Sequence, residues 1–290
     1  MSTTTLERVD AQAALKSLLK TYSTELTTRD KTSLEAAPDV LAPGAEVFIA
    51  SLPNDSIDGL VATAVQLRNA GLTPVPHIAA RNIESLAVFD ELLARLVGEA
   101  GLDRMLTLGG DRDKPAGDLH CSLQMIESGL IQKHGISRIF MACYPEGHPR
   151  ISDEVLERAR ADKLAAAKAG GLDVTLVSQF CFDAKPIIQL TARMRAQGTA
   201  VPYRVGVAGP AERATLVRYA LMCGVGASLR ALKERQALAR NVLAGETPEA
   251  LLTEVALAPA ANPALELEGV HLFTFGGLAR SAQWAESLRR

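Results

Sequence analysis

The stretch that decides the fold is residues 137–171, SRIFMACYPEGHPRISDEVLERARADKLAAAKAGG. It begins with a short, largely apolar run, 137–143, which has the length and composition of a buried β-strand. A polar turn follows, and then a segment of helical period, 152–169, that opens on Ser152 and two acidic residues and closes at Gly170 and Gly171. These are the usual start and stop signals of a helix. The stretch therefore predicts one strand–loop–helix unit.

The same unit recurs through most of the chain. Two further helices are expected at 56–70 and at 82–98, the second with Leu86, Phe89, Leu93 and Leu96 on one face. Strands that alternate with helices indicate a parallel sheet, and eight such units close a (β/α)₈ TIM barrel. The expected strands are 19–24, 46–51, 73–78, 104–108, 137–143, 173–178, 202–207 and 270–275.

The ends of this pattern complete the predicted domain. The interval between the seventh and eighth strands is long, and 211–258 has the pattern of added helices. The first twenty residues, MSTTTLERVDAQAALKSLLK, contain acidic side chains and no continuous apolar core, so we expect an amphipathic helix and not a signal peptide. No linker or change of composition divides the chain. The prediction is a single barrel domain over residues 1–290.

Composition excludes several classes of function. The 31 basic and 33 acidic residues are intermixed and give a net charge of −2, so we expect no nucleic-acid partner and no anionic membrane surface. No run approaches the roughly 18 apolar residues of a membrane span. The four cysteines are far apart without a CxxC pair, and we expect reduced, buried thiols in a cytoplasmic protein, with no disulfide and no metal site. They are Cys121, Cys143, Cys181 and Cys223.

Polar side chains follow six of the expected strands. One such residue is usually a turn or a helix cap, but in a TIM barrel the carboxyl ends of all strands meet at one rim, where active sites lie. The opposite strand ends begin with ordinary residues such as Asp103 and Asp173. The sequence therefore predicts an active site that draws on Glu25, Ser51, His77, Gly109-Gly110-Asp111, 144–148 and Gln179.

Four segments carry a resemblance to a known family. PHIAARN (76–82), LGGD (108–111), YPEGHP (144–149) and SQFCFD (178–183) resemble methylenetetrahydrofolate reductases in order and spacing. The resemblance extends from Glu25 to the last strand. It implies an eight-stranded barrel, usually with FAD, that interconverts 5,10-methylene- and 5-methyltetrahydrofolate with NADH or NADPH as the nicotinamide donor. It corresponds to the catalytic barrel of that family alone.

The resemblance also implies roles for individual residues. Glu25 matches the general acid that protonates the departing folate nitrogen, and Asp111 matches the carboxylate that stabilises a cationic iminium. Gln179 and Phe182 would contact the folate. The simpler interpretations are a solvated Glu25, a helix-capping Asp111, a core histidine at 77 and a rigid loop at 144–149. The residues expected at the cofactor are Ser51, His77, Gly110, Tyr144, His148 and Lys168.

Three departures from the family pattern concern the cofactor. Glu25 is followed by Leu26-Thr27-Thr28-Arg29 and not by aromatics and prolines, Gly109 stands where an arginine is usual, and Arg213 or a neighbour replaces a stacking phenylalanine. Aromatic residues are only 4% of the chain. We therefore expect FAD to be held loosely, or hydride to pass directly from the nicotinamide.

Two other classes of function remain open at this point. Gly276-Gly277 precedes an expected helix, so a barrel enzyme for a phosphorylated small molecule is one alternative. No Schiff-base lysine or metal-ligand cluster at a strand end supports it. A non-catalytic binding barrel is the other. The sequence leaves open the nicotinamide, the direction of reaction and whether the chain forms a homo-oligomer.

Overall fold

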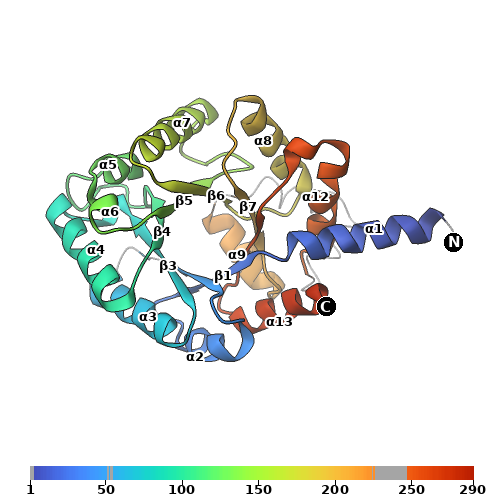
Figure 1. Ribbon diagram of the computed structural model, residues 1–290, viewed down its shortest axis with the longest axis horizontal. Coiled ribbons are helices and arrows are strands. Elements are labelled where there is room, and N and C mark those ends of the chain that lie inside the picture. The colour runs from blue at the N-terminus through green and yellow to red at the C-terminus, as the bar shows by residue number, and fades with distance from the viewer. Residues whose placement is uncertain (1–2, 51, 53–54, 224, 226–246) are drawn as a thin grey trace. The chain divides into compact units, whose positions relative to one another are not determined.

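The computed structural model describes residues 3–50, 52, 55–223, 225 and 247–290. Its strands are parallel and form a closed barrel in chain order, which confirms the (β/α)₈ TIM-barrel fold (Figure 1). The strands are β1 (Tyr22–Thr27), β2 (Glu46–Ala50), β3 (Thr73–Ala79), β4 (Arg104–Leu108), β5 (Arg138–Cys143), β6 (Asp173–Ser178), β7 (Tyr203–Ala208) and β8 (Gly269–Phe273).

The chain divides into two compact units. Unit 1 comprises Met1–Thr24, Tyr144–Arg150 and Val177–Arg290. Unit 2 comprises Glu25–Cys143 and Ile151–Leu176.

Unit 2 contains four neighbouring strands, β2 to β5, in parallel register. Phe48 of β2 and Phe140 of β5 lie with their ring centroids 5.0 Å apart, so both point into the barrel interior. Serine side chains cap three of its helices: Ser56, Ser85 and Ser152 accept bonds from the backbone N–H three residues on. The helices are α2 (Lys31–Val40), α3 (Ile57–Asn69), α4 (Leu86–Ala100), α5 (Ser122–Glu127), α6 (Leu130–Lys133) and α7 (Asp153–Ala169), with a 3₁₀ turn, η1 (Ala80–Asn82).

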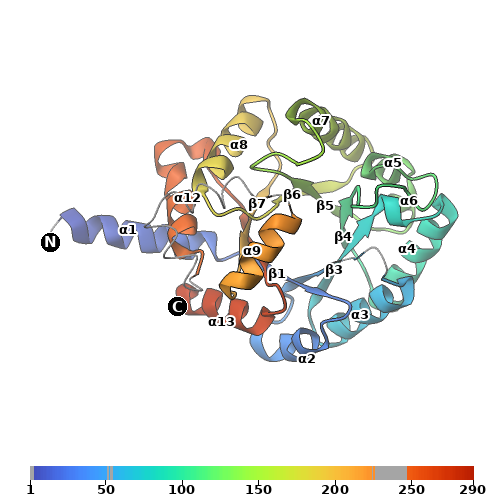
Figure 2. The same ribbon diagram turned by 180° about the vertical axis from the view of Figure 1, so that it is seen from behind.

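Unit 1 contains β7 and β8 together with the first half of β1, which pairs with β8. Ser23 Oγ lies 2.9 Å from His271 Nδ1, and both side chains are buried. The N-terminal helix α1 (Thr3–Leu18) packs against α12 (Glu249–Ala261), as both views show (Figures 1 and 2). The remaining elements are α8 (Ala184–Ala196), α9 (Arg213–Met222), η2 (Pro263–Leu265) and α13 (Leu278–Arg289).

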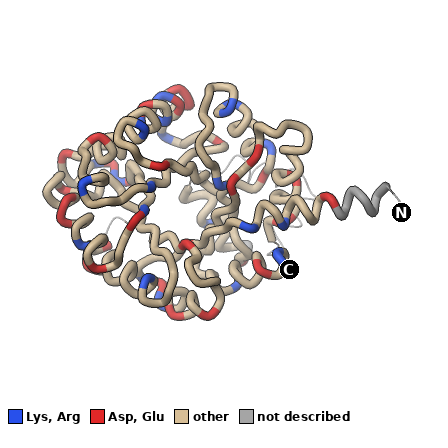
Figure 3. Tube along the Cα trace, viewed as in Figure 1, with Lys and Arg blue, Asp and Glu red and all other residues tan. Residues whose placement is uncertain are grey.

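Most expected elements are confirmed within a few residues, including helices at both ends of the long interval after β7. The interior of that interval, 226–246, lies outside the described residues. Acidic and basic residues are interspersed along the described chain, as Figure 3 shows. Within it no helix is both long and apolar enough to span a bilayer.

Three expectations were wrong in detail. The helix expected from Asn82 begins at Leu86, because the Ser85 side chain accepts from Val88 N and caps it there. Leu86 is 47% exposed, since the first position of a helix lies beyond the packed face. Cys121 is exposed, because it is the N-cap of α5 and not part of the apolar core.

Candidate functional site

Unit 2 brings three of the predicted residues to carboxyl ends of strands. Glu25 lies inside β1, two residues before its end, and is half-buried. His77 lies two residues before the end of β3 and packs edge-on against Phe48, with ring centroids 5.8 Å apart. Because Phe48 faces the barrel interior, His77 does so as well. Asp111 follows β4 and is exposed.

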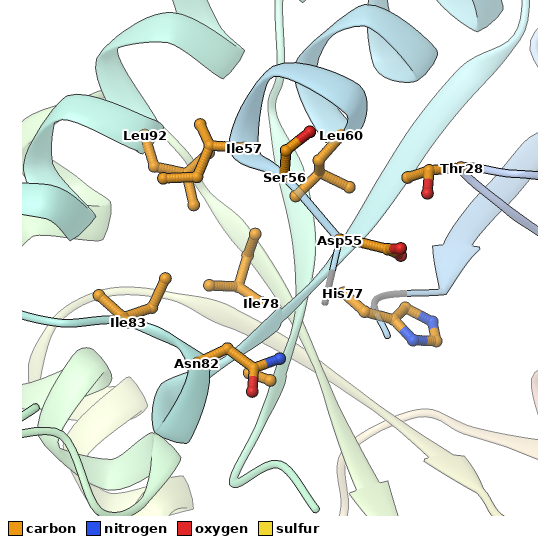
Figure 4. A pocket seen from close by; sticks show the side chains of 11 residues that line it. Thr28, Asp55, Ser56, Ile57, Leu60, His77, Ile78, Asn82, Ile83 and Leu92 are labelled. Carbon is orange, nitrogen blue, oxygen red and sulfur yellow. The ribbon is translucent and has the colours of Figure 1, made fainter. Parts of the chain in front are cut away.

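A shallow pocket lies beside His77 within unit 2 (Figure 4). Its empty volume is about 430 Å³, part of which is open solvent. Figure 4 shows aliphatic side chains, among them Ile57 and Leu92, gathered on one side, with Asp55 and His77 on the other. The complete lining is Thr28, Asp55, Ser56, Ile57, Leu60, His77, Ile78, Ala79, Asn82, Ile83 and Leu92.

The polar lining of this pocket is rich in hydrogen-bond acceptors. Asp55 accepts from Leu52 N and from the Arg29 guanidinium, at 3.0 and 3.1 Å, so its carboxylate is held in place. Asn82 Oδ1 is buried and, among the described residues, has no hydrogen-bond partner. A buried acceptor without a donor costs roughly 1–3 kcal/mol. The pocket therefore suits a ligand edge that donates N–H or O–H bonds.

Arg81 fixes the segment that carries Gly110 and Asp111. Its guanidinium donates to three backbone carbonyls, those of Arg112, Asp113 and His120, at 2.6, 2.5 and 3.3 Å. Its own backbone pairs with Gly109 O and Ala116 N, each at 2.9 Å. Bonds from a charged donor are stronger than neutral ones. Residues 109–120 are consequently tied to η1, directly beyond the His77 strand.

Gly110 and Gly117 allow this close approach. Gly110 has φ +98°, a conformation that favours glycine, and a Cβ there would lie 3.2 Å from the Ala79 Cβ. A Cβ on Gly117 would overlap the Glu84 carbonyl oxygen. Gly110 therefore has a backbone role at this site.

Replacement of Arg81 by alanine is expected to loosen residues 109–120. Loss of three charge-assisted bonds should cost about 2 kcal/mol locally, which corresponds to roughly thirtyfold faster amide hydrogen exchange in this segment. Arg68→Ala is the matched control, because Arg68 also donates to two backbone carbonyls of unit 2, Ala100 and Gly101. Unchanged exchange in Arg81→Ala, or an equal rise in the control, would contradict the prediction.

Unit 1 holds the remaining motif residues. Gly147 N donates to Tyr144 O at 3.2 Å, and this turn places the His148 ring edge-on to the Tyr144 ring at 5.1 Å. His148 Nδ1 accepts from Arg150 N. Gln179 Oε1 accepts from Phe180 N at 3.0 Å, so the carbonyl end of this side chain is turned to its own backbone. Phe182 is 7% exposed and belongs to an apolar cluster, which is a packing position.

The structure places neither of the two residues predicted to bind the cofactor, Lys168 and Ser51, with the site residues of unit 2 or with the motif residues of unit 1. Lys168 is exposed in the last turn of α7, just before β6 begins, and thus at the amino-terminal edge of the strands. Ser51 lies outside the described residues. Lys163, more than one turn earlier on α7, is half-buried, and burial lowers its pKa while the charge of a nearby Cys121 thiolate would oppose this.

Sequence reasoning missed Arg81, Asp55 and Asn82 as parts of the site. Arg81 and Asn82 lie inside the PHIAARN segment. A charged and an amide side chain directly after an apolar strand could have indicated that both belong to the site. Asp55 immediately precedes the helix expected at 56–70, and its position suggested only a helix start. Its ion pair with Arg29 depends on a contact between two loops, which a linear pattern does not reveal.

The closed barrel, with polar residues at the carboxyl ends of its strands, defines a TIM-barrel protein. Solved structures with a similar fold are known. The chain resembles dihydropteroate synthase from Thermus thermophilus, with 16% identity, a TM-score of 0.50, and coverage of 92% of this chain and 93% of that one. The same enzyme in complex with 6HMPPP matches with 16% identity, a TM-score of 0.49 and 93% coverage of each chain. No family model matches the chain. At this identity the likeness establishes the fold alone.

These findings correct the resemblance to methylenetetrahydrofolate reductases. No family model supports it, and the similar solved structure at a TM-score of 0.50 is a dihydropteroate synthase. The assignment to that family and the reductase activity were therefore wrong. The physical reason is that each βα unit ends its strand in a short polar turn, so motifs of four to seven residues recur at similar spacing in barrels of different function.

Proposed function

We propose that the chain is a folate-related TIM-barrel enzyme that binds the pterin ring of its substrate in the pocket beside His77. The observation that carries the proposal is the buried acceptor Asn82 Oδ1 in a pocket that is also lined by the fixed Asp55 carboxylate. A pterin edge presents an amino group and a ring N–H, which are donors for such acceptors. The similarity to dihydropteroate synthase from Thermus thermophilus supports the same substrate class.

The surrounding side chains suit this ligand. Aliphatic groups from α3, α4 and β3 form one wall of the pocket, against which a flat ring can pack. Arg29 pairs with Asp55, which lowers the cost of covering that carboxylate with a ligand. Glu25 and Asp111 are the carboxylates of unit 2 that we assign to proton transfer and to charge stabilisation.

Asn82→Ala is expected to weaken pterin binding by about tenfold to a hundredfold, on the order of 1–3 kcal/mol, because a ligand N–H loses its acceptor. The ligand-free protein should be as stable as before, since an unsatisfied buried acceptor is removed at the same time. Titration calorimetry with tetrahydrofolate and with 6-hydroxymethylpterin, and urea unfolding of the free protein, measure the two effects.

The control is Asn69→Ala, which removes an exposed amide at the end of α3. It should leave the affinity unchanged. Wild-type protein that binds no pterin at millimolar concentration would refute the proposed function, whereas equal affinity in Asn82→Ala would refute only the placement of the ring. FAD and NADH belong in the same titrations, because flavin and nicotinamide binding are still untested predictions.

A further inference from the structure

Arg29 reaches from the loop after β1 to a carboxylate of the pocket in unit 2. It follows Thr28, which lines the pocket, but its own side chain is 61% exposed. Its Nε and Nη2 atoms both lie 3.1 Å from Asp55 Oδ1. Two nitrogens of one guanidinium on the same oxygen hold the two charges in a fixed position relative to each other. The charge of Arg29 therefore acts on the pocket through Asp55.

The Asp55 carboxylate is buried, although it belongs to a loop. Its side chain is only 5% exposed. Oδ2 accepts from Leu52 N at 3.0 Å, and the Asp55 N–H donates to Leu52 O at the same distance. A buried carboxylate is costly unless it is paired with a cation. Leu52 supplies only a backbone hydrogen bond, so the compensating positive charge comes from Arg29.

The lining of the pocket supplies no further full charge of either sign. Among the described residues that line it, none is lysine or arginine, and Asp55 is the only carboxylate. Glu25 and Asp111 are not part of the lining. The other titratable group is the His77 imidazole, on the same side as Asp55 in Figure 4, and it adds no negative charge. The charge of the pair of Arg29 and Asp55 therefore decides which ring edges the pocket accepts.

We infer that Arg29 makes the pocket selective for an uncharged donor edge over a cationic one. Asp55 keeps lone pairs for a ligand N–H when it is paired with Arg29, and the pair is neutral as a whole. A cationic ring that approached Asp55 would also approach the guanidinium, and like charges repel. The inference rests on the proposed pterin site, and it assigns to Arg29 a role in specificity that acts through Asp55.

Two probes of similar size and different basicity test this role. 6-Hydroxymethylpterin presents a neutral edge, whereas 2,4-diamino-6-hydroxymethylpteridine has a more basic ring that can bind as a cation. Titration calorimetry at neutral pH gives the ratio of their affinities. In Arg29→Gln we expect the ratio to shift about tenfold toward the diamino compound, because a buried carboxylate without its guanidinium attracts a cation. Arg29→Lys keeps the charge and should stay within about threefold of the wild type.

Proton uptake is a second measurement, which a role in bracing the loop would not change. Titrations in buffers of different ionisation enthalpy count the protons taken up on binding. Arg29→Gln should take up more protons with the diamino compound than the wild type does, because it binds the protonated ring. A proton taken up by His77 or Asp55 would appear with 6-hydroxymethylpterin as well, so the difference between the probes reports the ring.

A variant of the partner residue and a matched control complete the test. Asp55→Asn removes the carboxylate but leaves Arg29, so the ratio should shift toward the pterin, and this variant decides the matter if Arg29→Gln does not fold. Arg95→Gln is the control, because Arg95 pairs with Asp58 in the same unit and neither residue lines the pocket. Its ratio should equal that of the wild type.

The outcomes separate this inference from the proposed function. It is overturned if Arg29→Gln leaves the ratio unchanged, or if Arg29→Lys or Arg95→Gln shifts it as far. It is also overturned if Asp55→Asn shifts the ratio toward the diamino compound. Wild-type protein that binds no pterin would refute the proposed function and this inference with it, whereas pterin binding with an unchanged ratio would refute the inference alone.

Discussion

Replacement of Gly206 by alanine is expected to lower the free energy of unfolding by about 3 kcal/mol or more, within the upper range for overpacked cores. Gly206 lies in β7, where all residues are buried. A Cβ at this position would lie 2.0 Å from the Ser178 carbonyl oxygen and 2.8 Å from the Phe273 ring. The Gly206 N–H also donates to Ser178 Oγ at 2.8 Å, so the strand cannot shift without losing that bond.

Urea unfolding followed by circular dichroism measures this loss, with Gly98→Ala as the matched control. Gly98 lies within α4, and a Cβ there meets no atom within 4 Å. Alanine should therefore stabilise the control by roughly 0.5–1 kcal/mol through helix propensity. Equal midpoints for Gly206→Ala and the wild type would show that β7 can move away from Ser178, contrary to the packing described above.

Arg104→Met is the second large effect, and we expect it to cost about 3 kcal/mol, at the low end for a broken buried ion pair because this one is partly exposed. Arg104 begins β4, and its guanidinium donates to Glu46 at 2.5 Å and to Asp103 at 2.7 and 3.0 Å. The side chains of Arg104 and Glu46 are 22% and 11% exposed. Methionine fills a similar volume but leaves the Glu46 carboxylate without its guanidinium partner.

A double-mutant cycle with Glu46→Gln tests the cause. The double variant should recover most of the loss, since the carboxylate that needed a cation is removed together with it. If the two losses simply add, the cost comes from packing and not from the charge pair.

The pH dependence of Arg104→Met gives an independent check. Hydrogen bonding to Arg104 is the main reason that the pKa of Asp103 is lowered, with the charges of Arg104 and Arg68 adding to it and burial opposing it. A carboxyl with a lowered folded-state pKa contributes stability above its unfolded pKa, and this contribution is lost as the pH falls below about 4. The wild type should therefore lose stability more steeply in that acid range than Arg104→Met does.

The helices and strands were predictable because their signals are local. The Ser152 cap, the first-turn acids and the closing glycines of 152–169 act within one turn of the backbone, and α7 has the predicted bounds to within a residue. The start of α4 was misplaced because Asn82 and Ser85 are both suitable caps. Asn82 belongs to the 3₁₀ turn η1, whose Arg81 donates hydrogen bonds to the segment after β4. The helix therefore begins after Ser85 and not after Asn82.

The site was only partly predictable, because its chemistry depends on contacts between loops. His77 and Asp111 could be named from strand-end positions, yet the sequence does not show that Arg81 holds the Asp111 segment or that Arg29 pairs with Asp55. The same limit explains the wrong family assignment. Short polar motifs after strands report the architecture of a barrel, whereas its reaction depends on which side chains face the same cavity.

By itself the sequence determined the order of strands and helices, and through their regular alternation the closed parallel barrel, because hydrophobic period, capping and turn preferences are properties of neighbouring residues. The tertiary structure alone decided which polar groups are buried without a donor, as at Asn82, and which rings stack, as Phe275 does on Tyr219 across 56 residues of chain. Those features arise from side chains that are distant in sequence and close in space. Their energies depend on burial and geometry that no local pattern contains.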